Sequence, residues 1–426
     1  MKIKKILKRL LQLHPKSVDL SLLRIKRLLK NLGNPENKIS NVIQVVGTNG
    51  KHSVCTALRE ILENSGYTVN LNISPSLRKF NERYYFSGKH ISDSKLYKLL
   101  SEVEKINNGK SITFHEFICA CFFLEASRNK SDVNILEAGL FFRLDASNVL
   151  KKNIASIIMP IGIDHKDFLK KGTIDEIVYE KCSHLLNGSK IFVSEQKKSV
   201  LPKIKKYIKK NSSQIFLFGK NYLYNKNSKG FIYQDKFGKI NLPLPNLLGD
   251  FQISNICTAI ATLRNLNKFK VKESHIREAI KKIRSEGRLQ IIKKGKLRNY
   301  VSKNNEIIVD GAHNSLAAFE IKKYLNTLDR KKKIVMVLGM MENKQHKEFI
   351  KILKSSIHYI VALDIPNQIN FIKKEKLLKI ALSCGVNSKT EKSIKTAFVK
   401  IAKENRNAII FCTGSLYFVG EILNLN

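Results

Sequence analysis

The sequence predicts an α/β protein with two units, each built around a mostly parallel β-sheet. Short apolar runs alternate with helical patterns, and this alternation occurs in two series along the chain. A hydrophobic share of 43% over 426 residues is ample for packed cores and excludes wholesale disorder. The lysine-rich stretch within 286–300 separates the two series. We therefore expect one domain over 1–290 and a smaller, Rossmann-like domain over 297–426.

The N-terminal segment, MKIKKILKRLLQLHPK, is predicted to form the first helix rather than a targeting peptide. Its Leu7, Leu10, Leu11 and Leu13 fit one face of a helix. It also lacks the continuous apolar region and the small-residue cleavage site of a signal peptide.

The remaining elements follow from apolar runs and helical periodicity. In the first series we expect strands at 42–46, 68–73, 133–137 and 154–159, and helices at 52–64, 93–107, 115–128 and 173–186. A β-hairpin is expected at 81–92 around Ser87-Gly88, and an antiparallel annex is expected within 190–243. In the second series we expect strands at 306–310, 333–339, 358–364 and 408–412, with helices between them and one starting at Asn314.

The net charge of +42, from 77 Lys+Arg and 35 Asp+Glu, allows two interpretations. The lysines are spread along the whole chain, which favours a solvated surface over a specific nucleic-acid site with clustered arginines. A polyanion-binding role is the alternative. No apolar run approaches the roughly 20 residues that span a bilayer, which excludes an integral membrane protein. The 7 cysteines lack paired CxxC spacing, which argues against disulfides or a zinc site and favours a reducing, cytoplasmic setting.

The strongest chemical signal is the segment Gly47-Thr48-Asn49-Gly50-Lys51-His52-Ser53, which follows an expected strand and opens an expected helix. Glycines allow backbone N–H groups to surround a phosphate, the helix start adds partial positive charge, and a lysine reaches the β- and γ-phosphates. The spacing is a shorter variant of the usual phosphate loop. The alternative, a glycine turn before an ordinary helix, does not account for the lysine and the hydroxyl.

Other polar residues lie where ligands of α/β sheets bind. Glu137 ends an expected strand and His165 follows the next one, so that these two and the Ser74 hydroxyl could hold Mg²⁺ beside phosphate oxygens. A purely structural hydrogen-bonding role is the alternative for each. Asn255 can offer a donor and an acceptor to an adenine edge, and Arg288 can clamp a γ-phosphate.

Ordered motifs along nearly the whole chain resemble the Mur ligase superfamily, and within it the dihydrofolate synthase/folylpolyglutamate synthase family. The matching segments are LHPKSVDLSL (13–22), GTNGK (47–51), SPSLRKFNER (74–83), TFHE (113–116), LEAGLFFRLDASN (136–148), IGIDHKDFL (161–169), Glu180-Lys181, LPLPNLLGDFQISNICTAIA (242–261), GRL (287–289) and DGAHN (310–314). The resemblance implies a P-loop ATPase-like central domain and a Rossmann-like C-terminal glutamate ligase domain, usually in a monomer.

The resemblance also implies the reaction and its site residues. ATP would phosphorylate a carboxylate of 7,8-dihydropteroate or a folate, and L-glutamate would then displace phosphate in a crevice that closes between the domains. ATP contacts are implied at Thr48, Asn49, Gly50, Lys51, His52, Ser53, Asn255, Arg288, Asp310 and His313. Two Mg²⁺ sites are implied at Ser74, Glu137, His165 and Lys181, with Lys51, His165 and Lys181 catalytic and Lys181 carbamylated. Pteroate contacts are implied at Asp19, Leu20, Ser21, Thr113, Phe114, His115, Glu116 and Asp145.

Three departures bear on this interpretation. His52 stands where the family usually has glycine, and Cys182-Ser183-His184 replaces a run of small residues after Lys181. Phe141-Phe142 replaces a Gly-Gly pair, so the rings either pack outward on a neighbouring helix or line the acceptor pocket and favour a flat pteroate. The alternatives are another amino-acid ligase of the superfamily, or a non-catalytic polyanion-binding relative. The resemblance predicts no specific nucleic-acid partner and no membrane partner.

Overall fold

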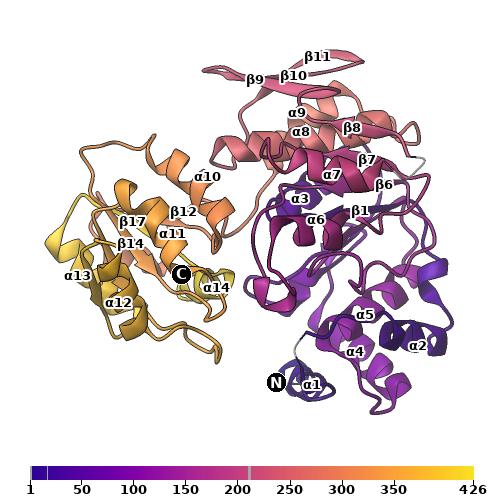
Figure 1. Cartoon of the computed structure of the whole chain (residues 1–426), viewed down its shortest axis with the longest axis horizontal. Helices are drawn as coiled ribbons and strands as arrows, with labels where there is room; N and C mark the ends of the chain where they lie inside the picture. The colour runs from indigo at the N-terminus through magenta and orange to yellow at the C-terminus, as the bar shows by residue number, and fades with distance from the viewer. Residues whose placement is uncertain (1, 17, 210–212) are drawn as a thin grey trace. The chain divides into compact units, whose positions relative to one another are not determined.

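The computed structural model describes residues 2–16, 18–209 and 213–426 (Figure 1). Contacts divide the chain into two compact units. Unit 1 comprises the described residues of 1–161, 174–245 and 253–283, and unit 2 comprises 162–173, 246–252 and 284–426. The short segments Gly162–Thr173 and Asn246–Gln252 thus belong to unit 2, although both lie within the continuous stretch expected to form the first domain.

Unit 1 contains an eight-stranded sheet in the order β4-β3-β2-β5-β1-β6-β7-β8. Six strands are parallel, and β3 and β4 form an antiparallel hairpin at one edge, as the sequence predicts. The strands are β1 Val42–Val46, β2 Val69–Asn72, β3 Tyr84–Phe86, β4 Lys89–His90, β5 Val133–Glu137, β6 Ala155–Ile158, β7 Lys190–Val193 and β8 Ile215–Leu217. The mostly parallel sheet is therefore confirmed.

Strand β1 lies at the point where the order of the sheet reverses, with β5 on one side and β6 on the other. All five residues of β1 are buried, because both faces of the sheet are covered. In the register, Val45 pairs with Glu137 and Val46 pairs with Ile158. Ligands of doubly wound sheets bind beyond the carboxyl ends of strands at such a point. The fold thus places the loop after β1 and the end of β5 together.

The helices of unit 1 surround this sheet and a second apolar cluster. Their bounds are α1 Lys2–Leu10, α2 Leu23–Asn31, α3 Lys51–Asn64, α4 Asp93–Asn107, α5 Phe114–Arg128, α6 Ile174–Cys182, α7 Leu201–Ile208 and α9 Glu273–Lys282; α8 covers Asp250–Asn265. Side chains of α1, α2, α4 and α5 share one core, and α5 is buried along most of its length. The expectation for Leu11 is wrong: α1 ends at Leu10, and Leu11 is 58% exposed.

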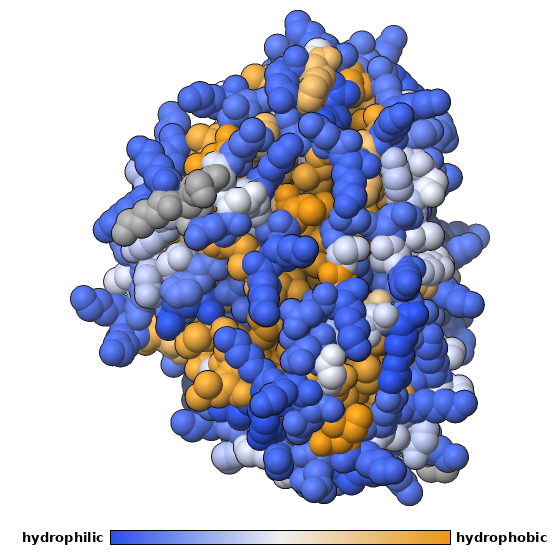
Figure 2. All heavy atoms as spheres, turned by 90° about the vertical axis from the view of Figure 1, so that its right-hand side faces the viewer, coloured by the Kyte–Doolittle hydropathy of each residue, from blue (hydrophilic) through white to orange (hydrophobic). Residues whose placement is uncertain are grey.

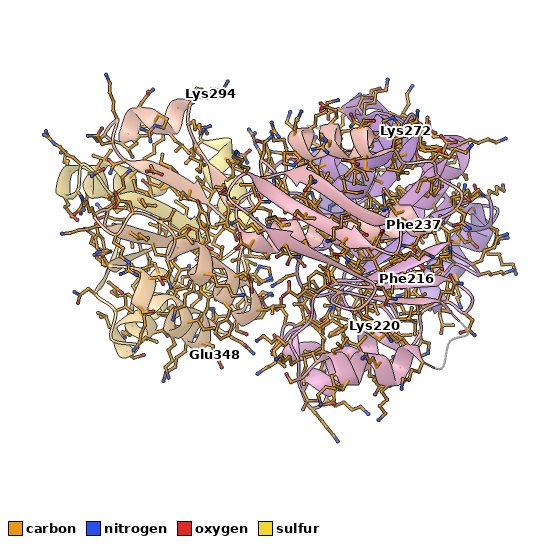
Figure 3. All side chains as sticks on the ribbon, turned by 90° about the horizontal axis from the view of Figure 1, so that it is seen from above. Phe216, Lys220, Phe237, Lys272, Lys294 and Glu348 are labelled. Carbon is orange, nitrogen blue, oxygen red and sulfur yellow. The ribbon has the colours of Figure 1, made fainter. Side chains whose placement is uncertain are left out.

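Only part of 190–243 forms the expected antiparallel annex. Strands β7 and β8 instead extend the parallel sheet, and the annex consists of β9 Tyr222–Lys226, β10 Gly230–Asp235 and β11 Gly238–Pro243. The ammonium group of Lys236 lies 4.8 Å from the ring centroid of Phe237 and 6.0 Å from that of Phe216 on β8, two rings labelled in Figure 3. A cation therefore links the annex turn to the edge of the main sheet.

Unit 2 is a doubly wound domain with a six-stranded sheet in the order β12-β13-β17-β14-β15-β16. Only β12 is antiparallel. The strands are β12 Gln290–Ile291, β13 Glu306–Val309, β14 Ile334–Leu338, β15 Tyr359–Ala362, β16 Ser388–Thr390 and β17 Ile409–Thr413; the helices are α10 Ser315–Leu325, α11 His346–Leu353, α12 Lys374–Ser383, α13 Ile394–Glu404 and α14 Leu416–Asn424. Asn314 caps α10 by accepting a 2.9 Å hydrogen bond from the Ala317 N–H, which fixes the helix start where the sequence predicts it.

The part of the chain that the structure describes also contains five short 3₁₀ helices: η1 Pro35–Asn37, η2 Phe80–Arg83, η3 Lys166–Phe168, η4 Lys296–Tyr300 and η5 Lys354–Ser356. Within the described residues, the structure has no helix long and apolar enough to cross a membrane. The face drawn in Figure 2 is mostly hydrophilic, with small apolar areas between the polar side chains.

Candidate nucleotide and acceptor sites

The loop between β1 and α3 is held by contacts from neighbouring parts of unit 1. The N–H groups of Thr48 and Asn49 both donate to the carbonyl oxygen of Pro160, at 2.9 and 3.3 Å. Gly50 has φ +83°, a left-handed conformation that glycine adopts without strain. It is also the N-cap of α3, and no side chain caps the helix there. The start of α3 thus presents backbone N–H groups and a partial positive charge, as an anion site requires.

The side chain of Lys51 folds back over this loop. Its ammonium group donates to the carbonyl oxygens of Gly47 and Thr48, at 3.2 and 3.3 Å. Ser53, two residues further along α3, is buried. A lysine ammonium group beside a helix start adds positive charge at a point where anions bind.

Asn255 on α8 lies directly against the loop. A Cβ atom added to Gly50 would be 2.7 Å from Asn255 Oδ1, and the whole Asn255 residue is only 3% exposed. The structure therefore brings together two residues that are more than 200 positions apart and that the sequence assigns to the same nucleotide. An amide at this point can present both a donor and an acceptor to a base edge.

Glu137 and Ser74 also meet in unit 1, as the proposed metal set requires. The Ser74 N–H donates to Glu137 Oε2 at 3.2 Å. The Ser74 hydroxyl oxygen is buried and has no hydrogen-bond partner among the described residues. A buried carboxylate beside an unsatisfied hydroxyl suits a hard divalent cation, which prefers oxygen ligands. In residues 2–16, 18–209 and 213–426, no group of three His, Cys, Asp or Glu side chains has metal-binding geometry. Other ligands, such as phosphate oxygens, would therefore have to complete the coordination of a metal ion at Ser74 and Glu137.

Lys181 is a second buried cation at the loop. It lies on α6, is 5% exposed, and donates to the Gly47 carbonyl oxygen at 2.9 Å. Its ammonium nitrogen is 5.5 Å from the ring centroid of Phe141. The helix is confirmed, although it ends at Cys182 rather than near 186.

Both phenylalanines of the 141–142 pair are buried, and Phe141 has φ +58°. The N–H groups of Phe142 and Arg143 donate to the Glu180 carbonyl oxygen at 3.1 and 2.8 Å, which ties this loop to α6. The Arg143 guanidinium also binds the Glu180 carboxylate at 2.9–3.1 Å. The loop therefore packs on the helix that carries Lys181.

The residues assigned to pteroate form two polar groups in unit 1. In the first, Thr113 and Glu116 make a capping box at the start of α5. Glu116 Oε2 accepts from the Thr113 N–H and hydroxyl, both at 2.8 Å. The Ser21 hydroxyl oxygen accepts from the N–H of Leu23, the first residue of α2, at 3.1 Å. Leu20 lies in the same N-terminal segment; Ser17, also part of the matching stretch, is outside the described residues.

In the second group, His115 Nε2 lies 3.2 Å from Asp145 Oδ2. Burial opposes the charged imidazole, but the adjacent Cys119 sulfur and the Asp145 carboxylate raise the pKa of His115 well above 6.5. Burial likewise opposes ionisation of Asp145, yet His115 and hydrogen bonds from Ser147 lower the pKa of that carboxyl. Each of the two groups therefore favours the charged form of the other. Phe114 is partly buried and packs against the apolar cluster that α1, α2, α4 and α5 share.

Two predicted residues of unit 2, His165 and His313, lie beside a buried carboxylate, Asp164, that the sequence analysis missed. Asp164 Oδ1 accepts from Lys344 Nζ at 2.7 Å, and Oδ2 accepts from Asn314 Nδ2 at 3.0 Å. His313 Nε2 lies 3.3 Å from the same oxygen, and His165, at φ +53°, lies 3.8 Å from it. Burial alone would raise the pKa of Asp164, but His313, His165 and Lys344 lower it well below 3.8.

Asp310 and Arg288 lie together in unit 2. The two carboxylate oxygens of Asp310 accept from the Leu289 and Ala312 N–H groups at 2.8 and 2.7 Å. Burial raises the pKa of Asp310, against the lowering effect of Arg288. Asp310 therefore fixes the turn after β13, and its remaining lone pairs are what a ribose hydroxyl would use.

Comparisons with known proteins cover nearly the whole chain. The Mur ligase middle domain family matches residues 45–263, and the family described as dihydrofolate synthetase, C-terminal domain, matches residues 293–425. The dihydrofolate synthase/folylpolyglutamate synthase of Buchnera aphidicola subsp. Acyrthosiphon pisum is 32% identical over 98% of this chain and 97% of its own. The structure of E. coli FolC in complex with DHPP and ADP is 26% identical, with a TM-score of 0.88 over 99% of this chain and 97% of that one. A structure from Yersinia pestis, described as the bifunctional folylpolyglutamate synthase/dihydrofolate synthase with AMPPNP and a Mn ion, is 22% identical with a TM-score of 0.84, over 99% of this chain and 97% of that one.

Proposed function

The chain belongs to the dihydrofolate synthase/folylpolyglutamate synthase family, and on that premise we propose that it uses ATP to join L-glutamate to 7,8-dihydropteroate, to a folate, or to both. The observation that carries this proposal is the loop between β1 and α3, which Lys51 and Lys181 contact at the Gly47 carbonyl oxygen and Asn255 contacts at Gly50. The DHPP and ADP held by the E. coli relative support the same substrate classes here.

The reaction follows from what these groups can do. The γ-phosphoryl group of ATP passes to the acceptor carboxylate and gives an acyl phosphate. The glutamate amine then attacks that carbonyl carbon, the C–N bond forms, and phosphate leaves with the C–O electron pair. The start of α3 and Lys51 hold the phosphates and neutralise the charge that develops on them. Asn255 orients the base, and the resemblance supports roles in nucleotide binding for Arg288, Asp310 and His313.

We propose that Mg²⁺ binds at two sites. When bound, it would further neutralise the charge that develops on the phosphates. The unsatisfied Ser74 hydroxyl and the Glu137 carboxylate suit one such ion, with His165 as a further proposed ligand. Lys181 can ligate a second ion only as a carbamate, because an ammonium group has no lone pair. In its ammonium form it binds the Gly47 carbonyl oxygen.

We further propose a cytoplasmic monomer without a specific nucleic-acid partner. All seven cysteines are free and buried, which supports a reducing compartment. The basic residues are spread along the chain rather than clustered, which supports an electrostatic rather than a sequence-specific effect on nucleic acids.

A single assay tests the function. Purified protein is incubated with ATP, Mg²⁺ and radiolabelled L-glutamate, and dihydropteroate and tetrahydrofolate are offered separately. We expect label in a glutamylated product, with one ADP formed per amide bond. Incorporation that depends on a different amino acid would point to another ligase of the superfamily, and absence of ADP formation with either acceptor would overturn the proposal.

A further inference from the structure

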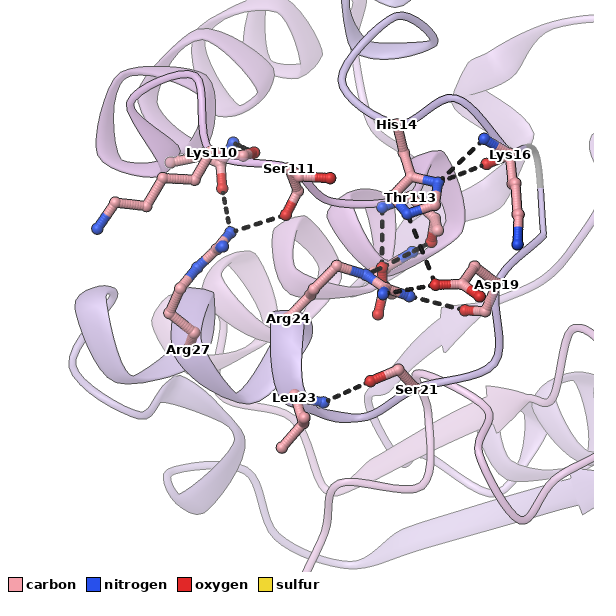
Figure 4. A network of polar contacts seen from close by, with 12 residues as sticks. His14, Lys16, Asp19, Ser21, Leu23, Arg24, Arg27, Lys110, Ser111 and Thr113 are labelled. Carbon is pink, nitrogen blue, oxygen red and sulfur yellow. Dashed lines mark hydrogen bonds and ion pairs between the residues drawn. The ribbon is translucent and has the colours of Figure 1, made fainter.

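Arg24, on the first turn of α2, connects two acidic residues that are far apart in the sequence (Figure 4). Its Nε donates to Glu116 Oε2 at 2.9 Å, and its Nη1 donates to Asp19 Oδ2 at 2.7 Å. Its Nη2 donates to the backbone carbonyl oxygen of Asp19, also at 2.7 Å. The guanidinium thus uses three of its donors on three fixed acceptors, a geometry that lysine cannot reproduce.

The carboxylate of Glu116 is only partly satisfied by these bonds. Its Oε2 accepts from Arg24 and from Thr113, as described above. Its Oε1 is buried and has no hydrogen-bond partner among the residues that the structure describes. A buried carboxylate oxygen without a donor is unfavourable, and an N–H group on a ligand would relieve that cost. Asp19 offers a second carboxylate, 36% exposed, on the other side of the same guanidinium.

Arg27, one helical turn further along α2, provides an internal contrast. It donates to Asn107 Oδ1 at 2.9 Å and to the Ser111 carbonyl oxygen at 3.3 Å, both of which are neutral. Arg27 therefore ties α2 to the turn before α5 without touching a carboxylate. Both arginines lie on α2 and carry the same charge, but Arg24 binds carboxylates whereas Arg27 binds neutral oxygens.

We propose that Arg24 is a positioning residue for the acceptor substrate, holding the carboxylates of Asp19 and Glu116 as a fixed pair of hydrogen-bond acceptors for the amino and ring N–H donors of a reduced pterin. This inference rests on the proposed function. The guanidinium binds both carboxylates and offsets their mutual repulsion, so that both are held in one orientation. Without it, the carboxylates separate and the pterin loses its paired acceptors, while the nucleotide loop is unaffected.

The test compares Arg24→Met and Arg24→Lys with the matched control Arg27→Met in the full-length protein. Steady-state KM values for dihydropteroate and for ATP are measured with kcat, and thermal unfolding is followed by circular dichroism. Direct binding of dihydropteroate is followed by pterin fluorescence, which no tryptophan obscures because the chain has none. We expect Arg24→Met to raise the KM and Kd for dihydropteroate at least tenfold and to leave the KM for ATP within twofold. Arg24→Lys should recover only part of the loss, and Arg27→Met should leave both acceptor constants unchanged.

The outcomes separate this inference from the proposed function. Wild-type protein that glutamylates neither dihydropteroate nor tetrahydrofolate overturns both. If the wild type is active and Arg24→Met binds dihydropteroate normally, or if Arg27→Met weakens binding equally, then Arg24 only stabilises the fold and the inference is wrong. If Arg24→Met fails to fold, the test uses Arg24→Lys. Full recovery of dihydropteroate binding by the lysine would show that charge alone is needed, and the inference would then be wrong.

Discussion

Because Gly50 lies against Asn255, we predict that Gly50→Ala weakens nucleotide binding, and Gly66→Ala in the same unit serves as the control. Gly50 and Gly66 have nearly the same φ, +83° and +86°, both in the left-handed region. A Cβ added at Gly66 meets nothing within 4 Å, whereas at Gly50 it would lie 2.7 Å from Asn255 Oδ1 and 3.0 Å from Met159 Cε. Both alanine variants therefore place a side chain at a left-handed φ, and only Gly50→Ala adds the steric contact.

The magnitude follows from these two contributions. A left-handed alanine costs roughly 1–2 kcal/mol, so both variants should lose about that much unfolding free energy. In Gly50→Ala the Asn255 amide must also move away. If that amide binds the base of ATP, the loss of about one hydrogen bond, roughly 1 kcal/mol, should raise the Kd for ATP about five-fold or more.

The assay is calorimetric titration with ADP and with a non-hydrolysable ATP analogue, together with urea unfolding. We expect Gly66→Ala to bind nucleotide as the wild type does, and Gly50→Ala and Asn255→Ala to bind it more weakly. In the double variant Gly50→Ala/Asn255→Ala, the steric contact with Asn255 is gone, so that stability should partly return but affinity should not. If Gly50→Ala binds nucleotide as tightly as Gly66→Ala, Asn255 is not a nucleotide contact and this reasoning is refuted.

Three further predictions concern the same unit. Lys51→Ala should abolish ADP formation with an unchanged circular dichroism spectrum, because it removes the cation above the loop; near-normal turnover would contradict the assigned role. Glu137→Gln keeps an acceptor for the Ser74 N–H but removes a charge, so Mn²⁺ binding in the presence of ADP, read from the electron paramagnetic resonance of free Mn²⁺, should weaken at least tenfold; unchanged binding would place the metal elsewhere. Phe141→Gly/Phe142→Gly should change the ratio of kcat/KM for dihydropteroate to that for tetrahydrofolate if the rings set specificity, and an unchanged ratio would leave them only a structural role.

The sequence predicts those elements whose signal is local. Strands β1 and β5 are buried on both faces and therefore appear as continuous apolar runs, with the bounds that the structure has. Strands β12 and β16 were missed because they have only two and three residues and lie at the sheet edges, where polar side chains are tolerated. Strands β7 and β8 were assigned to the annex because a short run does not reveal which sheet it joins.

The same distinction applies to the site. The phosphate loop is recognisable because its glycines, lysine and helix start are contiguous in the sequence. Arg24 and Asp164 were missed because their significance depends on partners 92 and 180 positions away, Glu116 and Lys344 respectively. Nothing local distinguishes Arg24 from the other basic residues of α2, since the whole helix is rich in them. Only the fold shows which basic side chain meets a buried carboxylate.

The Phe141-Phe142 pair shows why a departure from a family pattern could not be interpreted from the sequence. At φ +58°, Phe141 bears a strain of roughly 1–2 kcal/mol that glycine would avoid. Its ring is 2% exposed, however, and full burial of a phenylalanine contributes about 1.5–3 kcal/mol, which is enough to offset that strain. The centroid of the same ring lies 5.5 Å from the Lys181 ammonium nitrogen, within the range of a cation–π contact. The substitution is thus energetically tolerable, and its effect falls first on Lys181 and the loop that this lysine contacts.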